Sequence, residues 1–158
     1  MSKRISGLAA VQEAREQLSA VDQYVRSSGL EHKLISLVEL RVSQINGCAF
    51  CLSLHSKALR EAGEREDRLA VLPAWRETDW FTPRERAALA WAEAVTTLEH
   101  QQVPDEVYEQ AREQFTEKEL SDLTLAIIAI NGWNRFNIAL TQRPPVRFGT
   151  DVIAEAAD

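Results

Sequence analysis

Apolar residues recur at intervals of three and four along most of this 158-residue chain, and alternation of apolar with polar residues is almost absent. Such intervals place side chains on one face of an α-helix, whereas a half-buried strand requires alternation. The stripe formed by Leu34, Leu37, Val38 and Val42 is one example. The pattern predicts an all-α fold, and the length fits a single domain over residues 1–158.

Local start and stop signals divide this pattern into six to seven helices. Thr82 and Thr116 each precede a glutamate by three positions, Glu85 and Glu119, which is the sequence of a capping box. Glycine marks the C-terminal ends of expected helices, as at Gly47. The expected helices cover about residues 8–27, 31–45, 48–63 and 66–72, two more begin near 83 and 105, and the last covers 117–140.

The run from Leu123 to Ile130 is apolar on nearly every face of the last expected helix. A helix of this kind has to be buried all round, so we interpret it as a central helix or as the interface of a homo-oligomer. The run is far shorter than the roughly 20 residues that span a bilayer, and we expect no membrane span.

The tryptophans Trp75, Trp80 and Trp91 are expected in the core.

The charge of the chain bears on its partners and location. Eighteen Lys and Arg against 24 Asp and Glu give a net charge of −6. Nucleic acids require a cationic surface, so we expect no nucleic-acid partner. The apolar stretch at residues 8–11 is too short for a secretory signal, which points to the cytoplasm. Thiols stay reduced there, and two neighbouring cysteines then indicate redox catalysis or metal binding.

Two cysteines and a histidine form the candidate reactive site. Cys48, Cys51 and His55 follow at spacings of three and four, which places them on one helix face. Cys48 is expected in the first turn, where the helix dipole stabilises a thiolate. His55 lies one turn after Cys51 and can accept a thiol proton. A thiolate, a second thiol and a base are what peroxide reduction requires, because the sulfenic acid formed first condenses with its neighbour.

Two other interpretations of the cysteines stay open. Free cysteine is among the most buried residue types, so the pair could simply be small core residues. With His55 they also offer three zinc ligands, and Glu39 is the nearest candidate for a fourth, although no second Cys or His pair completes a structural site. A thioredoxin-like site requires a βαβ pattern that this chain lacks.

The segment from Gln44 to Cys51, followed by His55, resembles the signature of the carboxymuconolactone decarboxylase / alkyl hydroperoxidase D (AhpD)-like family. Segments 75–77, 81–89 and 133–135 also resemble its shorter members, so the similarity covers about residues 27–145. The resemblance implies an AhpD-like helical fold and thiol peroxidase chemistry without cofactor or metal. It further implies a peroxide substrate, a thiol or dithiol protein as reductant, and assembly into trimers or hexamers.

One position departs from the family pattern. The relay carboxylate of the family usually stands twelve residues before the first cysteine, where this chain has Ser36. Glu39 lies one turn later on the same face and is the candidate replacement, unless it pairs with a nearby Arg or Lys. The resemblance favours Cys51 as the thiol that attacks the peroxide and Cys48 as the resolving thiol, whereas the helix N-terminus favours Cys48 as the thiolate.

The sequence therefore predicts a thiol-dependent peroxidase in which Cys48 and Cys51 cycle between dithiol and disulfide. His55 is the expected base and Glu39 the residue that orients it. A non-enzymatic, redox-responsive oligomer is the alternative. Lactone decarboxylation is less favoured, because no cluster of Arg and His that would bind a carboxylate lies near the motif in the sequence.

Overall fold

The computed structural model describes residues 11–144, and within this range all regular elements are helical. The prediction of an all-α fold with six to seven helices is confirmed. The start of the first expected helix, residues 8–10, lies outside the described residues. The α-helices are α2 (Gln12–Ser27), α3 (His32–Asn46), α4 (Ala49–Glu61), α5 (Glu66–Val71), α6 (Pro83–Thr97), α7 (Asp105–Gln114) and α8 (Glu117–Ala139), with 3₁₀ segments η1 (Leu72–Glu77) and η2 (Glu99–Gln101).

Both predicted capping boxes are present. Oγ1 of Thr82 accepts the backbone N–H of Glu85 at 3.2 Å, and the Glu85 carboxylate accepts the backbone N–H of Thr82 at 2.8 Å. Thr116 and Glu119 make the same two hydrogen bonds, at 3.2 Å and 2.8 Å. These bonds satisfy backbone donors that have no partner within the helix, and they fix the starts of α6 and α8 where the sequence predicts them.

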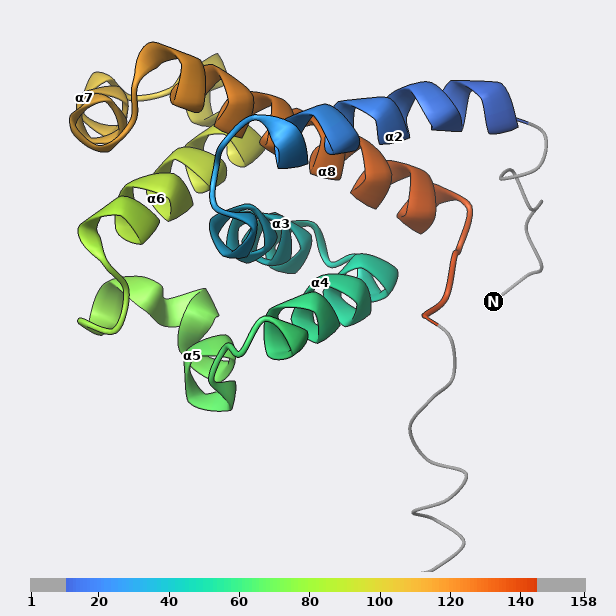
Figure 1. Ribbon diagram of the computed structural model, residues 1–158, viewed down its shortest axis with the longest axis horizontal. Coiled ribbons are helices and arrows are strands. Elements are labelled where there is room, and N and C mark those ends of the chain that lie inside the picture. Colours follow the sequence, from blue (N-terminus) through green and yellow to red (C-terminus); the bar gives the residue numbers. More distant parts are fainter. Residues whose placement is uncertain (1–10, 145–158) are drawn as a thin grey trace, which may run out of the picture.

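Helix α3 is the central helix of the fold. It packs against α4, α6 and α8, and nine of its 15 residues are buried. Figure 1 shows α3 near the middle of the molecule, with α2 and α8 together along one side of it. The buried face includes the predicted stripe and also Glu39, which is 5% exposed. A buried carboxylate is costly unless it is paired, so the partners of Glu39 decide how α3 contributes to the site.

The apolar run of α8 is buried on one side only. Leu123, Ile127 and Ile130 are in the core, while Leu125 is 37% exposed and Ile128 is 56% exposed. Of the two alternatives expected for this helix, the central position belongs to α3. The interface of a homo-oligomer is the alternative left for α8. We call Leu125 and Ile128 the exposed strip of α8. Within residues 11–144, no helix is long and apolar enough to cross a membrane.

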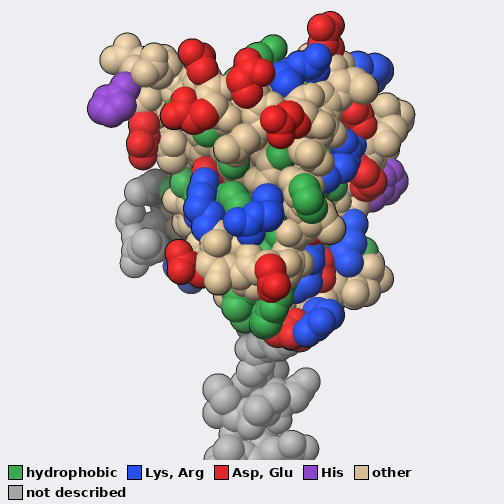
Figure 2. Space-filling model, turned by 90° about the vertical axis from the view of Figure 1, so that its left-hand side faces the viewer, with side chains coloured by type: hydrophobic (Ala, Val, Ile, Leu, Met, Phe, Trp, Pro, Cys, Tyr) green, Lys and Arg blue, Asp and Glu red, His purple; other side chains and the backbone are tan. Residues whose placement is uncertain are grey.

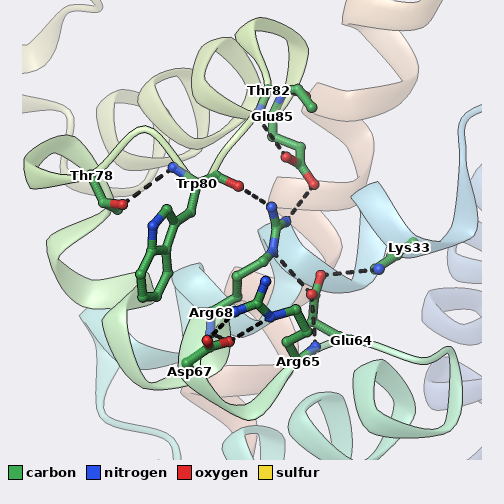
Figure 3. Close-up of polar contacts among 9 residues, drawn as sticks. All are labelled: Lys33, Glu64, Arg65, Asp67, Arg68, Thr78, Trp80, Thr82 and Glu85. Carbon is green, nitrogen blue, oxygen red and sulfur yellow. Dashed lines mark hydrogen bonds and ion pairs between the residues drawn. The ribbon is translucent and has the colours of Figure 1, made fainter.

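An ion-pair cluster connects α5 with α3 and α6 (Figure 3). Arg68 pairs with Glu64 at 3.0 Å and with Glu85 at 2.7 Å, and Glu64 also pairs with Lys33 at 3.2 Å. Glu64 is buried, which raises the pKa of its carboxyl, but the backbone N–H of Arg65 together with Lys33 and Arg68 outweighs burial and holds that pKa below the usual value. The cluster therefore fixes the position of α5 at the end of the molecule away from α2 and α8 (Figure 1).

The tryptophans divide between core and surface. Trp75 and Trp91 are buried, at 4% and 8% exposed, as predicted. The prediction for Trp80 is wrong, since its side chain is 44% exposed beside the ion-pair cluster, and the guanidinium of Arg65 lies 5.8 Å from its ring centre.

Figure 2 shows the face over α6 and α7, where acidic and basic side chains are interspersed without a continuous cationic surface on that face.

Candidate active site

A tight turn between α3 and α4 positions the two cysteines. Gly47 ends α3 with φ +70°, a left-handed conformation that favours glycine. Cys48 follows as the N-cap residue of α4, one position before the first turn in which the sequence predicts it. Its Sγ accepts the backbone N–H of Cys51 at 3.4 Å, so it occupies the place of a capping oxygen. The helix dipole favours negative charge at this position.

A partly buried network of side-chain amides holds this turn against α8. The side-chain amide of Asn46 donates to Asn131 and to Asn134, both at 2.9 Å. Asn134 is fully buried and donates to Oγ of Ser43 at 3.1 Å. Buried amides keep a fixed orientation when their partners are satisfied, and this network therefore fixes the backbone directly before Cys48.

Both cysteines are free and buried. The Cys48 thiol donates to Sγ of Cys51 at 2.8 Å, and the amide of Asn137 donates to the same sulfur at 3.4 Å. Burial and, after it, the hydrogen bond with Cys48 raise the pKa of the Cys51 thiol to about 11, while the Asn137 amide acts in the opposite direction. Cys51 is therefore protonated at neutral pH and needs a base before it can react as a thiolate.

A histidine–carboxylate pair stands next to Cys51. Nδ1 of His55 lies 3.1 Å from Oε2 of Glu39. A carboxylate only accepts hydrogen bonds, so Nδ1 carries a proton, and in the neutral form of the ring Nε2 is then the acceptor. His55 and Cys51 are one turn apart on α4 and line the same cavity. The arrangement supplies a proton acceptor beside the thiol that needs one.

Arg26 on α2 also binds the carboxylate of Glu39. Its Nη2 atom donates to both carboxylate oxygens of Glu39, at 3.0 Å and 2.7 Å. Burial raises the pKa of the Glu39 carboxyl, but the hydrogen bonds and charges of His55 and Arg26 outweigh burial, and the net pKa lies below the usual value. Glu39 is thus ionised at neutral pH. Glu39 lines the cavity, whereas Ser36, at the position of the family's relay carboxylate, is buried and does not line it.

A cavity of about 340 Å³ opens onto Cys51, His55 and Glu39. Its walls come from α2, α3, α4 and α8. Its apolar part consists of Phe50, Leu54, Ile130 and Trp133, and its further polar residues are Arg15, Ser19, Asp22, Arg26, Asn137 and Gln142. Cys48 is not among the lining residues, so Cys51 is the cysteine that a molecule in the cavity meets.

The structure thus brings Glu39, Cys48, Cys51 and His55 together and adds residues that sequence reasoning missed. Asp22 accepts a hydrogen bond from Nε1 of Trp133 at 2.8 Å, and burial raises the pKa of its carboxyl. The sequence has no cluster of Arg and His near the motif, but the fold brings Arg15 and Arg26 to the cavity from α2. Both arginines belong to an amphipathic pattern that is typical of any surface helix, so the sequence alone does not indicate that they line a site.

The zinc interpretation gains nothing from this geometry. Among the residues that the structure describes, no group of three or more His, Cys, Asp or Glu side chains is arranged to hold a metal ion. Nδ1 of His55 pairs with Glu39, and the Cys48 thiol donates a hydrogen bond to Sγ of Cys51.

Comparison with known proteins identifies the family. Residues 9–94 match the Carboxymuconolactone decarboxylase family. This chain belongs to that family. An uncharacterised relative in Bacillus subtilis, YdfG, is 39% identical over 143 residues, which are 90% of this chain and 97% of YdfG. The family resemblance expected from the motif around Cys48 and Cys51 is therefore confirmed.

Solved structures agree on the fold of this carboxymuconolactone decarboxylase family member. A protein of unknown function from Agrobacterium tumefaciens, named as a candidate antioxidant defence protein AhpD, superposes with a TM-score of 0.87 and 41% identity over 92% of this chain and 100% of its own. The debrominase Bmp8 superposes with a TM-score of 0.77 at 17% identity, over 88% of this chain and 75% of Bmp8. At that identity the likeness to Bmp8 shows the fold alone. The AhpD-like helical fold is confirmed.

Proposed function

We propose that this protein reduces organic hydroperoxides by a cycle between the Cys48–Cys51 dithiol and its disulfide. One observation carries the proposal. Cys51 faces a cavity with a second thiol 2.8 Å from its sulfur and with the His55–Glu39 pair one helical turn away. Attack on a peroxide, removal of a proton and resolution of the oxidised sulfur each have a group in place.

The first step oxidises Cys51. Nε2 of His55 accepts the thiol proton, and Sγ of Cys51 attacks the terminal oxygen of the hydroperoxide. The O–O bond breaks, the sulfur is oxidised to a sulfenic acid, and the departing alkoxide takes a proton from the imidazolium to leave as an alcohol. The ionised carboxylate of Glu39 stabilises the transient imidazolium, because opposite charges 3.1 Å apart attract strongly in a buried site.

The second step forms the disulfide, and the third regenerates the thiols. Sγ of Cys48 attacks the sulfenic sulfur of Cys51 and water leaves. An external thiol or dithiol protein then reduces the disulfide through a mixed disulfide and becomes oxidised itself. We place the cycle in the cytoplasm, where such reductants keep thiols reduced.

We further infer that the protein acts as a homo-oligomer, a trimer or a hexamer. The exposed strip of α8, Leu125 and Ile128, continues the buried apolar run of the same helix onto the surface. Adjacent exposed apolar side chains of this kind are typical of a surface that another protein covers. A second copy of the chain offers a matching apolar strip.

The test is consumption of cumene hydroperoxide with several thiol reductants by the wild type and by Cys48→Ser and Cys51→Ser. We expect sustained turnover by the wild type and loss of turnover in both variants, with at most one equivalent of peroxide consumed by Cys48→Ser. If the wild type forms the disulfide but sustains no turnover with any reductant, the protein is a redox-responsive oligomer and not a peroxidase.

A further inference from the structure

Helix α2 presents a polar row to the cavity. Arg15, Ser19, Asp22 and Arg26 follow at spacings of four, three and four, and all four line the cavity. Arg26 stands at the reactive end, where it bonds to Glu39. With a rise of about 1.5 Å per residue, Arg15 lies about 16 Å further along the helix axis. Arg15 and Arg26 therefore approach the cavity from opposite ends of α2.

The charges along this row are satisfied except at Arg15. Arg26 pairs with Glu39, and Asp22 accepts the indole N–H of Trp133. The side chain of Arg15 has no hydrogen bond or ion pair with any residue of the described chain, although its Nε atom is buried. A buried donor without an acceptor is costly, and a ligand that supplies an acceptor there relieves that cost.

The wall that α4 and α8 place opposite this polar row is mostly apolar. Phe50 and Leu54 of α4 face the same space as Ile130 and Trp133 of α8. Apolar walls with a few polar groups at defined ends are the usual form of a small-molecule site. A ligand that matches this cavity has an apolar middle, a reactive group at Cys51 and an anionic group at Arg15.

We propose that Arg15 binds the carboxylate of the substrate, so that the substrate class is organic hydroperoxides that also carry a carboxylate. The planar guanidinium presents paired N–H donors that match the two oxygens of a carboxylate. The hydroperoxide end of this inference rests on the proposed function, whereas the anion site at Arg15 does not depend on it.

Binding of an unreactive probe tests the anion site by itself. By calorimetry, the reduced wild type should bind 4-isopropylbenzoate about 10- to 100-fold more tightly than its methyl ester, the range expected for a hydrogen-bonded charge. Arg15→Gln should remove this preference and Arg15→Lys should keep part of it. Arg65→Gln, which removes the same charge from an exposed site outside the cavity, should leave the preference intact.

Turnover tests the substrate class. For cumene hydroperoxide bearing a para carboxylate and for its methyl ester, the acid-to-ester ratio of kcat/KM should fall in Arg15→Gln by the same factor as the binding preference. Equal binding of acid and ester by the wild type, or a preference that survives in Arg15→Gln, overturns the anion site. If the binding preference depends on Arg15 but neither hydroperoxide is consumed, the anion site stands and the peroxidase function is wrong.

Discussion

His55 and Glu39 meet across two helices, with Nδ1 of the imidazole 3.1 Å from Oε2 of the carboxylate. The contact joins central helix α3 to α4, which carries Cys51. Glu39 is ionised and also held by Arg26, so it fixes the orientation of the ring through Nδ1 and leaves Nε2 pointing away from the carboxylate. In the proposed mechanism, proton removal from the Cys51 thiol, with its pKa of about 11, depends on this ring.

Replacement of His55 by glutamine should slow oxidation of Cys51 by cumene hydroperoxide about 100-fold at pH 7, the low end for a positioned base. The pKa of Cys51 is raised to about 11, so without the base the thiolate fraction increases about tenfold per pH unit up to that value. The defect should therefore shrink as pH rises. Stopped-flow rates from pH 6 to 9 measure this, and a wild-type rate at pH 7 would show that His55 is structural.

Glu39→Gln should show a weaker form of the same pH-dependent defect, since the base remains but loses the charge that orients it. The matched control is Glu93→Gln, because Glu93 is another paired carboxylate with a lowered pKa but lies outside the cavity. The control should oxidise Cys51 at the wild-type rate. Equal rates in both variants would contradict a role of Glu39 in proton transfer.

The Glu39→Gln substitution should also change the stability of the fold in acid. Folding lowers the pKa of Glu39 from 4.5, so its ionised form stabilises the fold above that value, and the stabilisation is lost as pH falls through the lower folded pKa. In Glu39→Gln, this part of the acid destabilisation should be absent, as measured by urea unfolding between pH 3 and 6. An unchanged pH dependence would mean that the ion pair contributes nothing.

Local signals were sufficient to predict the helices. The capping residues Thr82 and Thr116 and the glycine at position 47 act within a few residues of themselves, so each marks a helix end regardless of the tertiary fold. The alignment of Cys51 with His55 is equally local, because one helical turn separates them. The misplacement of Trp80 has the opposite origin, since composition alone does not reveal whether a ring packs inward or lies on an arginine at the surface.

The rest of the site depends on helix packing that no local pattern encodes. Arg26 precedes Glu39 by 13 residues and Asn137 follows Cys51 by 86. Each contact exists only because α2 packs against α8, which itself packs against α3 and α4. Arg15 and Asp22 look like the solvated face of an amphipathic helix when the sequence is read alone. Their place in the cavity wall becomes visible only in the folded structure.

Asn137 tunes the thiol directly, because its amide donates to Sγ of Cys51 at 3.4 Å. Asn137→Leu keeps a similar volume but removes the donor, so the pKa of Cys51 should rise further. Alkylation of Cys51 by iodoacetamide at pH 8, measured in a Cys48→Ser background, should slow several-fold, up to about tenfold for one pKa unit. Unchanged or faster alkylation would contradict this role.

The exposed strip of α8 makes the oligomer testable. Light scattering should give a trimer or hexamer for the wild type, and Ile128→Glu should dissociate it, because a buried unpaired charge opposes association. Leu98→Glu is the control, since Leu98 is similarly exposed but lies on the turn after α6. A monomeric wild type at micromolar concentration would contradict the inference, as would dissociation in the control only.

The central claim is that Cys51 attacks the peroxide and Cys48 resolves the product. Its most direct test is intact-mass analysis after one equivalent of cumene hydroperoxide, in the presence of dimedone to trap sulfenic acid. The wild type should lose two hydrogens as the disulfide forms, Cys48→Ser should gain one dimedone adduct at Cys51, and Cys51→Ser should remain unmodified. An adduct at Cys48 in Cys51→Ser with none at Cys51 in Cys48→Ser, or no oxidation in any of the three proteins, would contradict the account.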